Sequence, residues 1–353
     1  MDLIPIRGRG ASYNPPNRFE RLHLDLDPVP DDPDDPTPGP ATQYFRDHTR
    51  SIIARNDSPD IPFSASVNCY RGCSHGCIYC FARPFHEYLG FSAGLDFETR
   101  IMVKEDAPEL LRRELGSRRW EPQVISMSGV TDPYQPIERK LRLTRGCLEV
   151  LAEARNPVGI VTKNHLVTRD VDLLGELARH DAVIVFLSVT TLDPKLQRVM
   201  EPRTSTPARR LDAIRELSAA GIPTGVMVAP SIPGLTDHEM PRILEAAAGA
   251  GATSAGYVPL RLPFAVKELF EKWLEQHFPD RKDKVLNRVR EMRGGKLNES
   301  EFYGRMRGEG VWATYLRRSF ETTCRRLGLN ERDLRLSTAA FRRIRTGPQM
   351  ELF

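Results

Sequence analysis

Short apolar runs rich in β-branched residues alternate with helical patterns over much of this chain. The runs occupy residues 100–104, 124–128, 158–162, 183–188, 223–229 and 253–259, and the helical patterns occupy residues 106–116, 141–155, 170–180, 206–220 and 237–250. Apolar strands separated by helices indicate a parallel sheet whose outer face is covered by those helices. Units of this kind fit a full or partial barrel better than a short open sheet. The predicted fold class is therefore α/β, a TIM-like (β/α) barrel with its chemistry on loops at the carboxyl ends of the strands.

Three cysteines in the short segment RGCSHGCIYC are the strongest chemical signal. Cys73, Cys77 and Cys80 have the spacing C-x3-C-x2-C. Three thiolates on one tight loop suit three corners of a [4Fe–4S] cluster, because soft sulfur ligands favour Fe–S iron. The fourth iron would then stay open for a substrate or cofactor.

The alternative is a zinc site completed by one of three nearby residues: His75, His86 or Cys69. Structural zinc sites usually consist of two separated ligand pairs, and no second pair follows downstream. The remaining cysteines, Cys147 and Cys324, lie in helical patterns and are interpreted as small buried hydrophobes.

The composition is that of an ordinary globular protein, with 40% hydrophobic residues. No apolar run reaches the length of about 18 residues that a membrane span needs, and the first residues lack the pattern of a signal peptide. We therefore predict a cytoplasmic protein with no membrane partner. In that compartment thiols stay reduced, so clustered cysteines indicate a metal rather than disulfides.

The segment CSHGCIYC resembles the signature loop of the radical S-adenosylmethionine (SAM) superfamily, including an aromatic residue before the last cysteine. NDSPDIPFSASVN, TDPYQPIERKLRLTR and VTKN resemble the spore photoproduct lyase-like branch, also described as DNA repair photolyase-like. The resemblance covers about residues 62–260 and implies a partial (β/α)6 barrel. It also implies a [4Fe–4S] cluster on Cys73, Cys77 and Cys80, with SAM bound at the fourth iron.

The resemblance also implies roles for single residues. Tyr79 would lie near the adenine of SAM. Lys163 and Ser188, at the ends of two strand runs, match a lysine and a serine that contact SAM in this branch. Thr131 and Asp132 follow another strand run and are candidates for binding the amino or ribose groups of SAM.

A further charged candidate lies in MEPRTSTPARR, after the run at 183–188. Arg203 is predicted to pair with the SAM carboxylate or with a phosphate. The alternative is a surface ion pair between Arg203 and Glu201.

By this likeness, one electron passed to SAM would yield a 5′-deoxyadenosyl radical, which removes a hydrogen atom from an unreactive carbon. The electron would come from a donor such as flavodoxin or ferredoxin. The chain departs from spore photoproduct lyase at one point: near the end of the third strand it has Ser128-Gly129-Val130, where the lyase keeps a hydrogen-donor cysteine. The exact reaction and its catalytic residues therefore stay open.

Two other segments each have two interpretations. TDPYQPIERK carries polar side chains on a loop interrupted by prolines, and these either contact substrate or close a rigid turn. The aromatic sequence FHEYLGF, residues 85–91, is interpreted as core packing for the first helix, with a base-stacking surface as the alternative.

The chain is predicted to have four parts: a disordered Pro/Asp-rich arm (1–45), the core barrel (46–260), a basic helical extension (261–345) and a tail (346–353). Residues 281–353 hold eighteen Lys and Arg against nine Asp and Glu, which indicates a polyanionic partner such as nucleic acid. The alternative is solvated charge on surface helices.

The tail ends in GPQMELF, with Gln349, Leu352 and Phe353 in the pattern Q-x-x-L-F. This resembles the peptide that bacterial proteins insert into the DNA sliding clamp. The alternative is a terminal helix packed on the core. We therefore predict a radical SAM enzyme that acts on nucleic acid, with DNA repair or modification favoured. The alternatives are a non-catalytic, metal-stabilised adaptor for DNA and the clamp, and a radical SAM enzyme that modifies RNA or protein.

Overall fold

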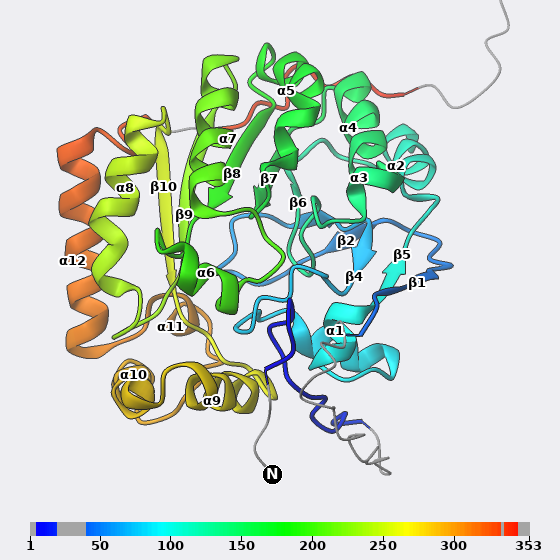
Figure 1. The fold of residues 1–353 in the computed structure, drawn as a ribbon. Helices are drawn as coiled ribbons and strands as arrows, with labels where there is room; N and C mark the ends of the chain where they lie inside the picture. Colours follow the sequence, from blue (N-terminus) through cyan, green and yellow to red (C-terminus); the bar gives the residue numbers. More distant parts are fainter. Residues whose placement is uncertain (1–4, 20–39, 333–334, 345–353) are drawn as a thin grey trace, which may run out of the picture.

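A seven-stranded sheet forms the centre of the computed structural model, which describes residues 5–19, 40–332 and 335–344 (Figure 1). The strand order is β10-β9-β8-β7-β6-β3-β2, and all neighbours run parallel except β2, which pairs antiparallel with β3. The strands are β2 (Ile53–Arg55), β3 (Ala65–Val67), β6 (Ile125–Met127), β7 (Val158–Thr162), β8 (Val183–Ser188), β9 (Thr224–Ser231) and β10 (Ser254–Pro259).

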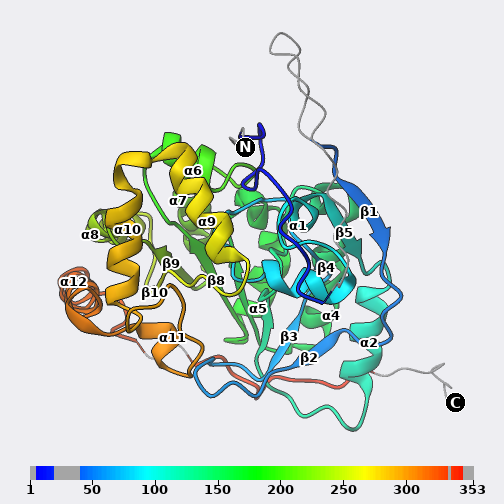
Figure 2. The ribbon, with the colours of Figure 1, turned by 90° about the horizontal axis from the view of Figure 1, so that it is seen from below.

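Helices alternate with the parallel strands and cover the sheet (Figures 1 and 2). The main ones are α2 (Ala107–Gly116), α4 (Leu143–Ala154), α5 (Val171–Ala178), α7 (Pro207–Ala219), α8 (Met240–Gly249) and α12 (Gly310–Leu327). Local sequence sets their ends. At α7 the Thr206 side chain accepts the Arg209 N–H, Pro207 opens the helix, and Gly221 turns the chain toward β9 with a φ of 76°.

Five predicted strands and five predicted helices agree with the observed elements to within three residues. The run at 100–104 is also a strand, β5 (Arg100–Val103), but its predicted place in the barrel is wrong. It lies in a second sheet of order β1-β5-β4, with β1 (Gln43–Arg46) and β4 (Tyr70–Arg71). The first parallel strand of the main sheet is β3, which is too short for its pattern to stand out in the sequence.

The main sheet confirms the predicted partial (β/α)6 architecture. Its parallel strands are β3, β6, β7, β8, β9 and β10, and the edge strands β10 and β2 do not pair with each other. The carboxyl ends of the parallel strands lie together on the lower side of Figure 1. The loops that leave this edge build the candidate site.

Short helices occupy the loops and the segments between the strands. They are η1 (Arg83–Leu89), α1 (Leu95–Thr99), α3 (Glu138–Leu141), η2 (His165–Asp170), α6 (Pro194–Met200) and η3 (Asp237–Glu239).

The described part of the N-terminal arm is docked on the protein, unlike the free arm predicted from its composition. Residues 5–19 run between α1 and α9 (Val266–His277), as Figures 1 and 2 both show. The N–H groups of Gly10 and Ala11 donate to the Glu98 carboxylate at 3.0 and 2.9 Å. Residues 40–45 are described as well and lead into β1, whereas arm residues 1–4 and 20–39 lie outside the described residues.

The C-terminal extension is helical over most of its described length. After α9 come α10 (Pro279–Glu291), α11 (Gly304–Arg307) and α12, which packs on α8. Residues 335–344 contain no helix. They cross the amino-end side of the sheet, where Ser337 donates its N–H to the Asp181 carbonyl and Arg342 to the Ala154 carbonyl, each at 2.8 Å.

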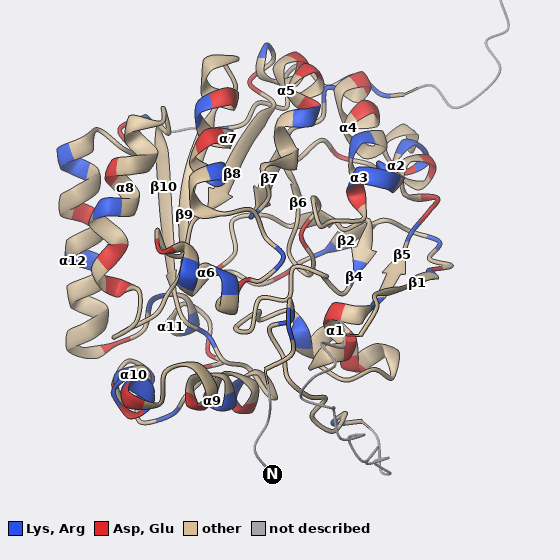
Figure 3. Cartoon of the chain, viewed as in Figure 1, with Lys and Arg blue, Asp and Glu red and all other residues tan. Residues whose placement is uncertain are grey.

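Many basic residues of this extension serve contacts within the protein. Arg293 is buried and donates to the Leu260 carbonyl at 3.0 Å, and Arg305 pairs with Asp60 at 2.5 Å. Figure 3 shows acidic and basic positions interspersed on α8 and α12. Net charge is therefore a weaker argument for a polyanion here than the sequence suggests. None of the helices in the described ranges is long and apolar enough to span a membrane.

Candidate active site

The cysteine loop follows β3 and β4 at the carboxyl edge of the sheet. Cys73 and Cys77 are buried, and Cys80 is half-buried. Gly72 and Gly76 have φ values of 78° and 69°, in the left-handed region that favours glycine. The loop is therefore a tight turn that holds three thiols beside the strand ends.

The three thiols fit a cluster that supplies positive charge. Burial and then the Glu201 charge raise the pKa of Cys77 well above its ordinary value, and burial together with Cys73 raises the pKa of Cys80 to about 11. Bare thiolates are disfavoured here, whereas bound iron would compensate their charge. In the described part of the chain, no three His, Cys, Asp or Glu side chains are placed to hold a single metal ion.

Of the three residues that could complete a zinc site, His75 and Cys69 have other partners, whereas the buried Nε2 of His86 has no hydrogen-bond partner in the described part of the chain. His75 Nδ1 lies 3.3 Å from an Asp132 carboxylate oxygen. His86 packs against aromatic rings, and the Cys69 sulfur lies 3.6 Å from that of Cys147 in α4. The zinc alternative is nevertheless disfavoured, because none of these residues forms a group of ligands for a single metal ion with the cysteines in the described part of the chain.

Lys163, just after β7, and Ser188, at the end of β8, meet at one point. The Lys163 ammonium donates to Ser188 Oγ at 2.7 Å and lies 3.3 Å from a Glu201 carboxylate oxygen. The centroid of the Tyr79 ring is 5.6 Å from the same ammonium. The structure thus brings together the three residues that the resemblance implies for SAM: Tyr79, Lys163 and Ser188, called here the Lys163 group.

Sequence reasoning missed the buried pair that supports the Lys163 group. Glu201 pairs with Arg210 of α7 and accepts the Tyr79 hydroxyl proton. Burial opposes its charge, but Arg210 and then Lys163 outweigh burial and hold the pKa of Glu201 well below its ordinary value. The alternative of a surface ion pair between Glu201 and Arg203 is wrong. The sequence held one local hint of the buried pair, because Arg210 follows Glu201 by nine residues.

Thr131 and Asp132, which follow β6, connect the loops around the site. Thr131 Oγ1 donates to the Gly72 carbonyl at 2.7 Å. The Asp132 carboxylate accepts the Thr162 hydroxyl at 2.7 Å and the Lys163 N–H at 2.8 Å. These contacts tie the cysteine loop to the ends of β6 and β7, and direct contact of either residue with SAM stays a prediction.

His75 and Asp132 form a buried pair beside the cysteine loop. Burial opposes the charge on each, but the two charges stabilise one another. The pKa of His75 is therefore raised to about 10, with a further contribution from Cys73, and that of Asp132 is lowered. The ion pair therefore joins the cysteine loop, which carries His75, to the loop after β6, which carries Asp132.

Arg203 lies apart from this network. It is exposed, and its guanidinium donates to Thr42 Oγ1 at 3.1 Å. Its backbone N–H donates to the His75 carbonyl at 3.2 Å. Its predicted pairing with the SAM carboxylate or a phosphate stays a prediction.

The radical SAM superfamily model matches residues 67–247, about half of the chain. The chain belongs to the radical SAM superfamily. An uncharacterized protein of Mycobacterium tuberculosis is 40% identical over 234 residues, 66% of this chain and 68% of that protein. One from Methanocaldococcus jannaschii is 28% identical over 224 residues, 63% and 80% of the two chains. A radical SAM Nα-GlyT isomerase of Pseudomonas phage M6 is 27% identical over 168 residues, 47% of this chain and 33% of that protein.

Solved structures of spore photoproduct lyase share the fold. The lyase complexed with dinucleoside spore photoproduct has a TM-score of 0.55 and 17% identity, covering 81% of this chain and 80% of the lyase chain. A mutant lyase with bound AdoMet and the same dinucleoside has a TM-score of 0.54 and 18% identity, with the same coverage. The predicted resemblance to this branch is confirmed at the level of the fold.

Membership of the radical SAM superfamily makes the chain an enzyme that cleaves SAM by a radical mechanism. Its cofactors are a [4Fe–4S] cluster and SAM, and the three thiols and the Lys163 group fit them. The alternative of a non-catalytic adaptor is wrong, because the match to this superfamily of enzymes runs from the end of β3 into α8.

The loop TDPYQPIERK is a rigid turn of the radical SAM core. Gln135 accepts the Ser74 N–H at 3.0 Å, next to the first cluster cysteine. The Glu138 carboxylate accepts the Tyr70 hydroxyl at 2.5 Å and the Thr144 N–H at 3.1 Å. Within the loop the Asp132 carboxylate accepts the Tyr134 N–H at 2.8 Å, which confirms a turn closed by local hydrogen bonds, and contact of the loop with substrate stays a prediction.

The core-packing interpretation of FHEYLGF is wrong for two of its rings. Phe85 is 51% exposed and Tyr88 is 67% exposed, whereas His86 between them is buried. The exposed rings lie in η1, a few residues after Cys80.

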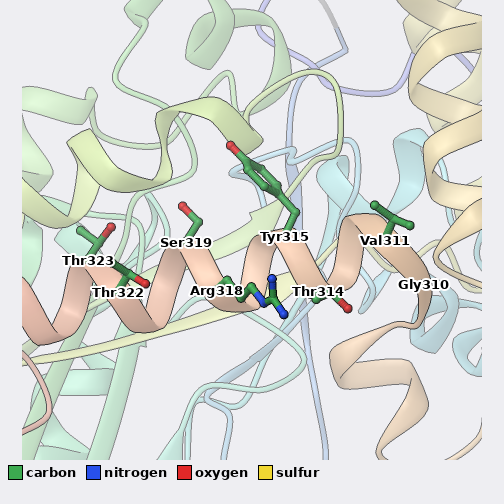
Figure 4. Close-up of a pocket in the computed structure, with 8 residues that line it drawn as sticks. All are labelled: Gly310, Val311, Thr314, Tyr315, Arg318, Ser319, Thr322 and Thr323. Carbon is green, nitrogen blue, oxygen red and sulfur yellow. The ribbon is translucent and has the colours of Figure 1, made fainter.

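A hollow of about 800 Å³ lies along the outer face of α12, away from the cysteine loop (Figure 4). Its lining is Gly310, Val311, Thr314, Tyr315, Arg318, Ser319, Thr322 and Thr323. All of these residues belong to one helix, and hydroxyl groups dominate the polar lining. The hollow therefore adds nothing to the chemistry of the radical SAM site.

Proposed function

We propose that this radical SAM enzyme acts on nucleic acid, in DNA repair or modification. The observation that carries the proposal is the fold shared with spore photoproduct lyase over four fifths of both chains, since that enzyme is seen with a dinucleoside lesion. The name Nα-GlyT isomerase of the phage relative also describes a radical SAM enzyme. The alternatives are RNA or a protein side chain as substrate.

In this proposal Cys73, Cys77 and Cys80 hold three irons of the cluster. The bound cluster and SAM supply the one-electron chemistry that generates a 5′-deoxyadenosyl radical for hydrogen abstraction. The protein positions SAM and excludes water. Val130, in the loop after β6, packs against the apolar surface around Cys73 and Cys80 and limits solvent access.

The Lys163 group provides the polar contacts for SAM. The Lys163 ammonium is a fixed cation, because Ser188 Oγ, the Ala229 carbonyl at 3.1 Å and Glu201 surround it. Tyr79 stays protonated and donates to Glu201, since burial and then the Glu201 charge raise its pKa well above the ordinary value. Its ring is therefore held in one orientation, suited to lie against the adenine.

Anaerobic purification and a deuterium-transfer assay test the proposal. The wild type should contain about four irons and four sulfides, and should form 5′-deoxyadenosine from SAM on reduction. Ala variants of Cys73, Cys77 and Cys80 should lose both properties, whereas the matched control Cys324→Ala should keep them, because Cys324 lies in α12.

The substrate class is tested with deuterated DNA, RNA and protein extracts. Deuterium recovered in 5′-deoxyadenosine from DNA supports the proposal, and recovery from protein alone overturns it. Flavodoxin and ferredoxin serve as electron donors in parallel reactions.

The sliding clamp remains a proposed partner through Gln349, Leu352 and Phe353, which lie outside the described residues. A chain ending at residue 348 should lose affinity for the clamp and keep its SAM cleavage. Unchanged clamp affinity would remove this partner and leave the proposed reaction intact.

A further inference from the structure

Large aromatic side chains from three separate segments are exposed near the cysteine loop. They are Phe19 (55% exposed), Phe81 (45%), Phe85 (51%), Tyr88 (67%) and Phe264 (59%), called here the aromatic surface. Single exposed aromatic residues are common and need no explanation, whereas a group of them marks an interaction site.

Arg18 gathers three of these rings into one group. Its guanidinium carbon lies 4.7 Å from the ring centroid of Phe19, 5.2 Å from that of Tyr88 and 4.0 Å from that of Phe264. The ring centroids of Phe19 and Tyr88 are 4.9 Å apart, and those of Phe85 and Tyr88 are 6.5 Å apart. The rings are therefore ordered by mutual contacts while much of their surface faces solvent.

The backbone of Phe264 is strained, and the packing of its side chain does not compensate for the energy of that strain. Its φ is 48°, in the left-handed region that a bulky side chain rarely adopts. Glycine would be the ordinary residue at such a position, and a ring that is 59% exposed gains little from burial. Strain of this kind is typical of positions where the side chain has a function.

The aromatic surface borders the radical SAM site. Phe81 directly follows the cluster cysteine Cys80, and Phe264 lies in the loop between the carboxyl end of β10 and α9. Phe19 ends the described N-terminal segment, which runs between α1 and α9 in Figure 2. A molecule bound on these rings would reach the edge of the sheet where the cofactors bind.

Basic side chains accompany the rings. The Arg261 guanidinium lies 5.4 Å from the Phe81 ring centroid, and its buried Nε has no hydrogen-bond partner in the described part of the chain. Lys267 is exposed in the first turns of α9, three residues after Phe264. Arg18 is the exception, because Glu87 already pairs with it at 2.9 Å. Aromatic rings with adjacent cations complement a ligand that combines flat bases and phosphates.

We propose that the aromatic surface stacks unpaired bases of the nucleic-acid substrate, with Arg261 and Lys267 at its phosphates. The proposal rests on the proposed function and adds the state of the strand. Base faces inside a duplex are already stacked, so exposed rings can bind them only where the strand is single or a base is turned out. The occupant is thus a segment with unpaired bases, for which a single strand is the simplest probe, rather than an intact duplex.

The test is the fluorescence anisotropy of the anaerobic holoenzyme with labelled oligothymidylate and with a hairpin duplex. The double variant Phe85→Ala/Tyr88→Ala should bind the single strand about 10- to 100-fold more weakly than wild type. Its SAM cleavage without nucleic acid should be unchanged. The matched control is Phe302→Ala/Tyr315→Ala, whose rings are 50% and 46% exposed on other segments, and it should bind like wild type.

A second variant separates binding from folding. Phe264→Gly should weaken binding of the single strand and leave the thermal unfolding midpoint unchanged or higher, because glycine accepts a φ of 48° without strain. A purely structural ring would lower the midpoint on removal and leave affinity unchanged, which would overturn the inference.

The outcomes distinguish this inference from the proposed function. If wild type binds the single strand and the double variant binds it equally well, the inference is overturned and the proposed function stays intact. If the double variant keeps the affinity of wild type but has a changed sedimentation coefficient, the surface is assigned to a second copy of the chain. If it keeps that affinity but a protease cuts it within residues 20–39 at a changed rate, the surface is assigned to that segment. Either result also overturns the inference. If wild type binds no nucleic acid and takes no deuterium from it, the proposed function is overturned, and the inference that rests on it is overturned as well.

Discussion

Two buried arginine–glutamate pairs flank the cysteine loop and differ in what else holds the glutamate. Glu98 pairs with Arg83, and its other partners are the backbone N–H groups of Gly10 and Ala11. Glu201 pairs with Arg210, and its other partners are the Tyr79 hydroxyl and the Lys163 ammonium. The first glutamate is held by backbone groups, and the second supports the side chains that we propose bind SAM.

The arginine of the first pair is a structural clamp. Arg83 donates to the carbonyls of Cys77, Ala93 and Gly94 at 3.0, 3.1 and 2.9 Å, in addition to Glu98. Its guanidinium N–H groups therefore bind the cysteine loop and the residues just before α1. The same ion-pair chemistry holds the fold on one side of the loop and, on the other, orients the groups that we propose bind SAM. This difference predicts which substitutions damage stability and which damage SAM binding.

The largest expected effect follows from Glu98→Gln. The substitution leaves the Arg83 charge buried without a counter-ion, which costs about 3 to 5 kcal/mol of folding free energy. The thermal unfolding midpoint, followed by circular dichroism, should fall by roughly 10 °C. Iron content should fall with it, because the clamp holds the loop that carries Cys77.

Glu105→Gln is the matched control, since Glu105 is exposed and its contact with Arg46 is 3.6 Å long. It should leave both quantities unchanged. If Glu98→Gln instead kept its midpoint and weakened SAM binding, the two pairs would not differ as described.

The second prediction tests the docked N-terminal segment, which the sequence suggested was free. A Cβ atom on Gly10 would lie 1.8 Å from the Gly76 carbonyl oxygen, so Gly10→Ala forces the segment away from the cysteine loop. The expected cost is about 2 kcal/mol, with faster loss of iron to a chelator. Gly175→Ala in α5 is the control, because its Cβ meets no atom within 4 Å. Equal rates of iron loss in the two variants would contradict the structural role of the segment.

Local patterns account for what the sequence predicted correctly. Periodicity gave the strands from β6 to β10 and their helices, and strand ends drew attention to Lys163 and Ser188, which do meet. The cysteine spacing is local as well. These features depend on neighbours within a few residues, so single-sequence reasoning reaches them.

Apart from the short strand β3 and the Glu201–Arg210 pair, the misses are contacts between distant segments. Tyr79 and Glu201 are 122 residues apart, Gly10 and Glu98 are 88 apart, and Cys69 and Cys147 are 78 apart. Phe85 and Tyr88 were assigned to the core because aromatic residues are usually buried, yet exposure depends on what the rest of the fold places over them. No local pattern carries that information.

The third prediction concerns acid stability. Burial opposes ionisation of Glu201, but Arg210 and Lys163 outweigh it, so its pKa is lower in the folded protein than in the unfolded chain. Such a carboxylate stabilises the fold above the unfolded pKa of about 4.3, and this contribution is lost as the pH falls below that value. Between pH 5 and pH 3, wild type should lose about 2 kcal/mol more than Glu201→Gln in urea titrations. If the free energies of unfolding of wild type and Glu201→Gln changed equally with pH, Glu201 would not be the ionised partner of Arg210. Glu149→Gln, exposed on α4, should follow the wild-type profile.

The smallest expected effect is the sharpest test of the comparison. Lys163→Met removes the ammonium and keeps the length of the side chain, while Glu201 retains Arg210 as its counter-ion. Stability should therefore change little, whereas SAM affinity, measured by equilibrium dialysis of the anaerobic holoenzyme, should fall about tenfold, or about 1.4 kcal/mol. Lys195→Met, at an exposed position in α6, should bind SAM like wild type. A Lys163→Met protein that keeps its iron, unfolds early and still binds SAM would assign Lys163 to the fold rather than to the cofactor.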